Sequence, residues 1–351
     1  MFVPLTTAYA EPRVEAVPVL EPGIYPGDAL QWYDKWPPPI VIISDGPYGL
    51  ASYPGDPPTP TTLAQWYAPH VAKWSEKATP QTTLWFWNSE LGWATVHPIL
   101  AASGWRYRSC HIWDKGLEHV AGNANTKTLR MFPIVTEVCV QYVREPEFWT
   151  NGHRMTMKQW LRSEWARAGL PFHLANTACG VKNAATRKYL TADHLWYYPP
   201  VGAFVRLADY ANKHGAPSGR PYFSLDGKQP ISGERWGRMR AKFYCEMGIN
   251  NVWREPPVRN GERVKINGKN AHMNQKPLRL LALALRASSD EGDCVWEPFG
   301  GLCSVAVAAH RLSRPCYCAE IVPAYYEVAK QRLVEAHRHL SNGDRHLSPP
   351  V

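Results

Sequence analysis

Two short motifs, far apart in the chain, each combine a carboxylate with a tight turn. The first follows the apolar run from Ile40 to Ser44 and consists of Asp45, Gly46, Pro47 and Tyr48. The second follows a shorter apolar run and consists of Glu297, Pro298, Phe299, Gly300 and Gly301. A carboxylate accepts hydrogens from amines and hydroxyls, and glycine lets backbone N–H groups approach a ligand closely. Each motif is therefore a candidate ligand-binding turn at the end of a strand.

The stretch from Asp293 to Glu320 predicts the unit that positions the second motif. Residues 294–296 and 317–319 have the composition of short strands, and residues 305–312 that of a helix. Ligands of doubly wound sheets bind outside the carboxyl ends of the strands, where an acid such as Glu320 commonly accepts ribose hydroxyls. We therefore expect half of a nucleotide-binding sheet; the alternative is that the glycine pair forms only a tight turn.

The N-terminal half supplies the remaining elements of the predicted sheet. Strands are expected at 40–44, 83–87 and 107–113, and helices at 63–77 and 93–104. The segment 51–62 is rich in proline, glycine and threonine, which predicts a loop that could close on a substrate. Alternation of strands and helices favours an α/β fold with a mostly parallel sheet.

The motifs resemble those of the permuted, beta-type DNA amino-methyltransferases that use S-adenosylmethionine, in which the catalytic motif precedes the cofactor motif. The catalytic signature of the family is Asp or Ser, then Pro, Pro, and Tyr or Phe. Its cofactor signature is Asp-Pro-Phe-x-Gly-x-Gly. His272 to Pro277 (HMNQKP) resembles the family's His-Pro-Thr-Gln-Lys-Pro motif, and Val252 to Pro257 its Val-Trp stretch. The resemblance covers 25–115 and 248–333. It implies a Rossmann-like methyltransferase sheet, circularly permuted, with an inserted target-recognition region.

The resemblance also implies a role for each motif residue. Asp45 and the carbonyl of Gly46 would accept the two hydrogens of an exocyclic amine, Pro47 would keep the turn rigid, and Tyr48 would stack on a flipped base. Asp28 would lie near the adenine of the cofactor, Gln275 and Lys276 near its methionine end, and Phe299 against it. The implied cofactor-binding residues are Asp28, Gln275, Lys276, Glu297, Pro298, Phe299, Gly300, Gly301, Ser304 and Glu320. In-line methyl transfer depends mainly on positioning, so we expect no metal.

Four residues depart from the family pattern. Gly46 stands where the family most often has proline, which predicts a looser turn. Glu297 replaces an aspartate, and Ser304 replaces a threonine. Cys303 occupies the place of the second family glycine, which predicts a side chain close to the cofactor.

The positive charge of the chain is concentrated in its middle. Residues 151–276 contain 21 Lys and Arg against 8 Asp and Glu, whereas the remainder contains 18 against 22. A basic segment between two halves of a sheet predicts contact with a polyanion, although a merely soluble surface is the alternative. We expect an irregular arm at 1–22, a catalytic half at 23–144, a target-recognition region at 145–248, a cofactor-binding half at 249–340 and a tail at 341–351.

Composition limits the remaining possibilities. No run of 18 apolar residues and no basic-then-apolar leader is present, so we expect a cytoplasmic protein of a bacterial, archaeal or phage-infected cell, with no membrane partner. The eight cysteines include no Cys-x-x-Cys pair, which disfavours zinc and disulfides.

The leading hypothesis is a site-specific methyltransferase that transfers a methyl group from S-adenosylmethionine to N6 of a flipped adenine in double-stranded DNA. Asp at the first catalytic position is commoner among adenine enzymes of the family. The alternatives are N4-cytosine methylation and a DNA-binding homologue that has lost catalysis. RNA is disfavoured because no RNA-binding motif is present. A cognate restriction endonuclease, a role in restriction-modification and a homodimer are left open.

Overall fold

The computed structural model describes residues 20–51, 55–116, 128–150, 152–259, 262–266, 268–272 and 274–341. The chain forms two compact units. The smaller unit includes Glu145–Arg240, and the larger includes the described residues before and after this segment. Most of the predicted arm and tail, at 1–19 and 342–351, falls outside the described residues, as do residues 52–54 of the predicted loop.

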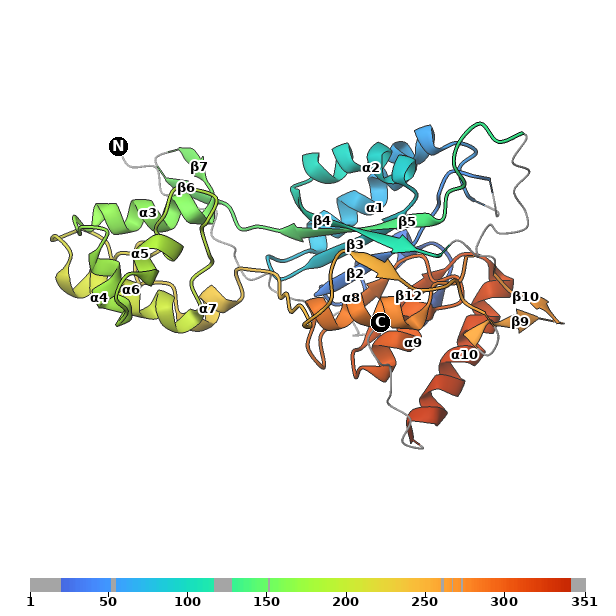
Figure 1. Cartoon of the computed structure of the whole chain (residues 1–351). Coiled ribbons are helices and arrows are strands. Elements are labelled where there is room, and N and C mark those ends of the chain that lie inside the picture. The colour runs from blue at the N-terminus through green and yellow to red at the C-terminus, as the bar shows by residue number, and fades with distance from the viewer. Residues whose placement is uncertain are drawn as a thin grey trace. The chain divides into compact units, whose positions relative to one another are not determined.

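The larger unit is built on an eight-stranded sheet (Figure 1). In sheet order the strands are β1 (Gly23–Pro26), β12 (Cys316–Glu320), β11 (Val295–Glu297), β2 (Val41–Ser44), β3 (Thr83–Asn88), β5 (Thr136–Arg144), β4 (Trp105–Asp114) and β8 (Val252–Arg254). Only β5 runs antiparallel to its neighbours, so the predicted α/β class and mostly parallel sheet are confirmed. Strand β5 itself is an element that the sequence analysis did not identify.

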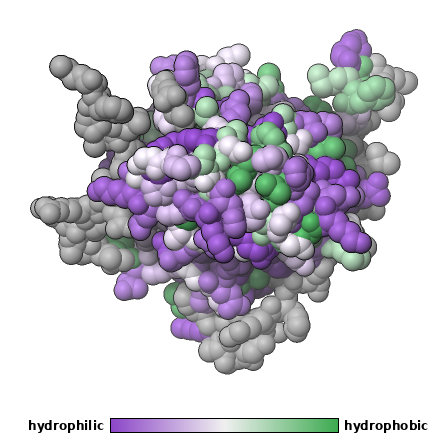
Figure 2. Space-filling view, turned by 90° about the vertical axis from the view of Figure 1, so that its left-hand side faces the viewer, coloured by the Kyte–Doolittle hydropathy of each residue, from purple (hydrophilic) through white to green (hydrophobic). Residues whose placement is uncertain are grey.

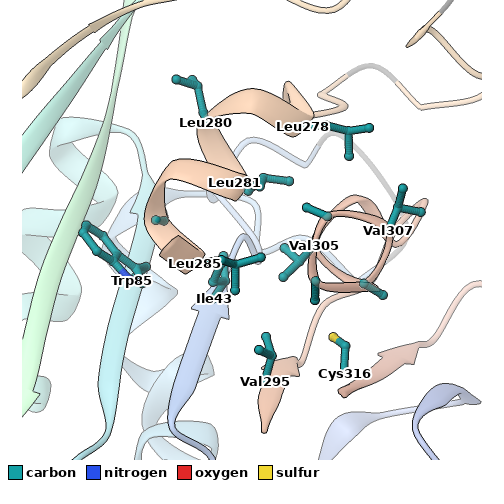
Figure 3. Close-up of a cluster of buried hydrophobic side chains, with 14 of the residues drawn as sticks. Ile43, Trp85, Leu278, Leu280, Leu281, Leu285, Val295, Val305, Val307 and Cys316 are labelled. Carbon is teal, nitrogen blue, oxygen red and sulfur yellow. The ribbon is translucent and has the colours of Figure 1, made fainter. Parts of the chain in front are cut away.

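Helices cover both faces of this sheet. On one face lie α1 (Leu63–Lys77) and α2 (Glu90–Ala102), and on the other lie α8 (Leu278–Ser288), α9 (Ser304–Arg311) and α10 (Pro323–Ser341). Side chains alternate between the two cores because successive residues of a strand point to opposite faces. In β2, Ile42 packs with α1 and α2, whereas Ile43 packs with α8 and α9, as Figure 3 shows for the second core.

Helix boundaries follow local sequence signals. Helix α1 spans the predicted residues 63–77, whereas α2 begins at Glu90 rather than at the predicted Trp93. The cause is Ser89, whose side chain accepts a hydrogen bond from the backbone N–H of Gly92 and so caps the helix one turn earlier. The apolar helix α8 starts directly after Pro277, which has no N–H to leave unpaired.

The smaller unit is mainly helical and has its own core. Its elements are a hairpin of β6 (Phe148–Thr150) and β7 (His153–Met155), followed by α3 (Met157–Arg167), α4 (Leu174–Cys179), α5 (Ala184–Tyr189), α6 (Val201–His214) and α7 (Gly233–Gly237). The ring of Trp236 stacks on Phe204 and Tyr198, with centroid distances of 4.0 and 4.7 Å. The buried residues of this core belong to the smaller unit alone.

The topology of the larger unit creates a crevice between β11 and β2. Strand β11 leads to α9 on one face of the sheet, whereas β2 leads to α1 on the other. Such a reversal of direction leaves space outside the carboxyl ends of the strands, which is where ligands bind in doubly wound sheets. Both sequence motifs directly follow these two strands.

Candidate functional site

A cavity of about 190 Å³ lies in this crevice, and all fourteen site residues predicted from sequence line it. Twelve of them lie at or after the carboxyl ends of four neighbouring strands, since Asp28 follows β1, Glu320 ends β12, Glu297 ends β11 and Asp45 follows β2. Gln275 and Lys276 reach the cavity from the segment before α8. Residues separated by almost 300 positions in sequence are thus brought to one site.

The carboxylate of Asp45 is held at one of its two oxygens. Oδ1 lies 2.9 Å from the Nζ atom of Lys276 and 3.1 Å from the hydroxyl of Tyr48. Among the described residues, no hydrogen bond is donated to Oδ2, and the Asp45 side chain remains 24% exposed. One carboxylate oxygen is therefore available to a ligand in the cavity.

Glu137 of β5 anchors the partners of Asp45 and was missed in the sequence analysis. Its Oε2 accepts hydrogen bonds of 2.9 Å from both the Tyr48 hydroxyl and the indole N–H of Trp87, and lies 3.3 Å from Nζ of Lys276. Its Oε1 pairs with Lys115 at 2.6 Å. No local motif surrounds Glu137; the only signal was a carboxylate within a largely apolar strand, TEVCVQYVR.

These contacts shift the pKa values of the four groups. Burial would lower the pKa of Lys276, but Asp45 and Glu137 outweigh it and raise this pKa. Burial also raises the pKa of Asp45 despite the opposing effect of Lys276. For Glu137 the two lysines outweigh burial and lower the pKa. Burial, Asp45 and Glu137 together raise the pKa of Tyr48 well above its usual value, so its hydroxyl keeps its hydrogen.

The structure gives Lys276 and Gln275 contacts that the family resemblance does not describe. Lys276 has a side chain only 2% exposed and binds the two carboxylates, although it also lines the cavity. The amide of Gln275 accepts a hydrogen bond from the backbone of Val264 and donates one to the carbonyl of Glu262. Gln275 thereby anchors the segment that carries the short hairpin β9 (Lys265–Ile266) and β10 (Lys269–Asn270). Met273, within the same motif, lies outside the described residues.

The turn after β11 is held by Glu320 and packs tightly on β12. The backbone N–H of Gly301 donates to Oε2 of Glu320 at 2.6 Å, and that of Val322 to Oε1 at 2.6 Å. A Cβ on Gly300 would lie 2.5 Å from Sγ of Cys318, so only glycine fits at this position. Burial raises the pKa of Glu320, which these backbone donors oppose.

Glu297 caps the helix that follows the turn. Its two carboxylate oxygens accept hydrogen bonds from the backbone N–H groups of Val305 and Ala306, at 3.0 and 2.8 Å. These N–H groups belong to the first turn of α9, where the helix itself offers no acceptors. Burial nevertheless raises the pKa of Glu297 to about 8.

Cys303 does not reach the cavity, so the expectation of a side chain close to a ligand is wrong. Its Sγ is buried 2.9 Å from Sγ of Cys318, and Cys303 is not among the lining residues. It adopts a φ of +54°, the left-handed conformation that glycine prefers, which accounts for the family glycine at this place. Glu297, Cys303 and Cys318 are close enough to share a metal ion, but the oxygens of Glu297 already cap α9.

An aromatic wall borders the cavity on the side of Asp28. The rings of Trp66 and His70 are stacked with centroids 4.8 Å apart, and both contact Phe299, at 5.3 and 4.9 Å. Burial lowers the pKa of His70 to about 4, so its ring is neutral near pH 7. Asp28 accepts a hydrogen bond from the backbone of Leu30 at 2.9 Å. The sequence analysis missed Trp66 and His70, which lie on α1 without a recognisable motif. Such a wall suits a flat heteroaromatic ring.

Comparison with known proteins agrees with the motifs. The family model for N6/N4 DNA methylases, described as DNA methylase, matches residues 40–331. The PvuII DNA methyltransferase, cytosine-N4-specific, is 11% identical; the match covers 93% of this chain and 94% of that chain, with a TM-score of 0.49. A Thermus thermophilus protein described as a DNA modification methylase, solved with S-adenosyl-L-methionine, is 14% identical. The match covers 89% of this chain and 95% of that chain, with a TM-score of 0.45. Within the described residues, no helix is long and apolar enough to cross a membrane.

Proposed function

Because the chain belongs to the N6/N4 DNA methylase family, we propose that it transfers a methyl group from S-adenosylmethionine to N6 of adenine in double-stranded DNA. The observation that carries this proposal is that one cavity brings Asp45 together with the glycine turn after β11. A DNA amino-methyltransferase needs both parts, because an amine acceptor and a methyl donor must meet in line.

We place the cofactor in the part of the cavity formed by β1, β12 and β11. S-adenosylmethionine supplies an electrophilic methyl group when it is bound. Asp28 and the aromatic wall of Trp66 and Phe299 suit its adenine, and Glu320 suits the ribose hydroxyls at the end of β12. Gly300 and Gly301 let the chain pass close to the ligand. Lys276 is bound to two carboxylates, and we therefore assign it to Asp45 rather than to the methionine end of the cofactor.

The base fits beside Asp45. An exocyclic amine is a poor nucleophile because its lone pair is delocalised into the ring. Oδ2 of Asp45, to which no described residue donates a hydrogen bond, would accept one amine hydrogen, and the carbonyl of Gly46 would accept the other. When the new nitrogen–carbon bond forms, the methyl–sulfur bond breaks and the nitrogen becomes cationic. It would then release a proton, and the carboxylate of Asp45 on the cavity lining would accept it. Flipping the base costs about a few kcal/mol.

The smaller unit, with the linker up to Gly248, suits the target-recognition region. Hydrophilic residues dominate the face of the molecule drawn in Figure 2. Exposed cations of this unit include Arg154, Lys182, Arg187, Lys188, Arg206, Lys213, Lys228, Arg235, Arg238 and Arg240. Lysine and arginine displace the counterions of phosphates, which gives DNA affinity its salt dependence. We assign contact with DNA phosphates to these exposed cations. We assign recognition of the bases to the smaller unit as a whole, without naming the residues.

Nucleoside mass spectrometry tests the proposal. DNA would be taken from cells that express this chain, and in parallel from cells that express Asp45→Ala. N6-methyladenine found only with the unchanged chain supports the proposal. N4-methylcytosine in its place would retain the amino-methyltransferase and change the base. Neither product, in cells that supply cofactor and varied DNA, would contradict the activity and favour a DNA-binding protein without catalysis.

A further inference from the structure

The contacts of Lys276 connect Asp45 to a second carboxylate that does not line the cavity. Lys276 is 2% exposed at its side chain, and its Nζ lies 2.9 Å from Oδ1 of Asp45 and 3.3 Å from Oε2 of Glu137. Tyr48 repeats this bridge, with its hydroxyl 3.1 Å from Asp45 and 2.9 Å from Glu137. A phenol has one hydrogen, so it donates to only one of the two carboxylates at a time.

Charge balance within this cluster is complete. Asp45 and Glu137 carry two negative charges, and Lys276 and Lys115 carry two positive charges. A buried ion pair is stable only when its remaining donors and acceptors are satisfied. Glu137 meets that condition with Trp87, Lys115 and Lys276 as donors, joined by Tyr48 when its hydrogen points away from Asp45. Loss of one member would leave an uncompensated charge beside Asp45.

We propose that Glu137 is a positioning residue for the methyl transfer: it holds Lys276 on Oδ1 of Asp45, shares the hydrogen of the Tyr48 hydroxyl with that oxygen, and thereby presents Oδ2 to the substrate amine. The inference rests on the proposed function, because it assigns a role in that reaction. Glu137 does not touch the cavity, so it acts only through these two side chains.

A purely structural ion pair is the competing explanation, and pH dependence separates the two. The groups that act on Asp45 are Lys276, Glu137 and Tyr48; Lys115 acts through Glu137, Cys139 interacts with both carboxylates, and His272 with Lys276. Lys276 lowers the pKa of Asp45, whereas Glu137 raises it. Removal of the Lys276 charge must therefore raise the pKa of Asp45, and removal of the Glu137 charge must lower it.

The test measures methyl transfer to plasmid DNA from pH 5 to 9 for the full chain and for Glu137→Gln, Lys276→Met and Lys276→Arg. Glu137→Gln should reduce kcat by roughly 10- to 100-fold, as losses of supporting partners do elsewhere, with little change in KM. The acidic limb of the pH–rate profile of this variant should move to lower pH. Lys276→Met should move that limb to higher pH, and Lys276→Arg should partly restore the original profile. Glu246→Gln, which removes a carboxylate paired with Arg286 outside the cavity, is the control.

Each outcome is decisive. Opposite shifts of the acidic limb, with thermal melting close to that of the control, support the positioning role. Unchanged profiles, or activity losses that only follow lowered melting temperatures, would overturn it while leaving the enzyme intact. If the unchanged chain methylates no DNA at any pH, the proposed function fails and this inference fails with it.

Discussion

Gly46 and Phe299 are in such close contact that a Cβ on residue 46 would lie 2.6 Å from Cδ2 of the phenylalanine ring. The hydroxyl of Tyr67 would be equally close, at 2.5 Å. The turn after β2 and the turn after β11 therefore touch through a glycine backbone and an aromatic ring. In this chain the contact leaves no room for a side chain at residue 46 unless Phe299 or Tyr67 shifts.

Gly46→Ala should consequently destabilise the protein. The added methyl group must displace Phe299 or Tyr67, and overpacking of this kind costs about 1–3 kcal/mol. We expect lower thermal stability and reduced methyl transfer, measured by melting curves and incorporation assays. Gly219→Ala is the matched control, because nothing lies within 4 Å of a Cβ at that position. Equal melting temperatures for the two variants would mean that Phe299 and Tyr67 can move aside at little cost in free energy.

Glu297→Gln should change how stability depends on pH. The folded-state pKa of Glu297 is raised by burial from 4.5 to about 8, so its stabilising contribution is fully present below pH 4.5 and is lost as the pH rises through 8. Glutamine does not titrate, and its carbonyl can still accept one helix N–H. The difference in unfolding free energy between variant and wild type should grow in favour of the variant by up to about 1.4 kcal/mol per pH unit within this window. A constant difference from pH 5 to 9 would show that the two helix N–H groups keep Glu297 ionised.

Cys303→Gly should leave cofactor affinity within about twofold of wild type, because the thiol points away from the cavity. Glycine relieves the left-handed backbone at φ +54° but loses the buried contact with Cys318, and these effects oppose each other. Calorimetric titration with S-adenosylmethionine measures the affinity. A clear gain in affinity would restore the view that Cys303 intrudes on the cofactor.

Replacement of Lys213, Lys228 and Arg235 by glutamine, all in the smaller unit, should weaken DNA binding and reduce its salt dependence. Each phosphate contact that is lost lowers the slope of log K against log salt by about 0.9. All three side chains are exposed. Fluorescence anisotropy at 50 to 200 mM salt measures the slope, with Lys330→Gln on α10 as the control for a general change in charge. A slope unchanged in the triple variant would assign the DNA surface to other cations.

Local motifs explain why much of the site could be predicted. Asp45 and Glu297 each follow a short apolar run, and adjacent residues in sequence are enough to place an acid at the end of a strand. Glu320 was found in the same way, from its position after the second strand of a strand–turn–helix–strand unit. The parallel sheet followed from the alternation of strands and helices.

What could not be predicted depends on contacts between distant segments. Glu137 is 89 positions from Tyr48 in sequence, and only the pairing of β3 with β5 brings it to the cluster. The crowding of Gly46 by Phe299 is likewise a property of the folded chain. The direction of the Cys303 side chain depends on its backbone conformation, which a family motif written for glycine does not reveal.

The separate cores of the two units have a consequence for how the sequence can diverge during evolution. Among the described residues, no buried side chain is shared between the core of the smaller unit and the two cores beside the sheet. Substitutions among the core residues of the smaller unit therefore remove no side chain from the two cores beside the sheet. A lineage of such proteins is free to diversify one module rapidly while selection preserves the other.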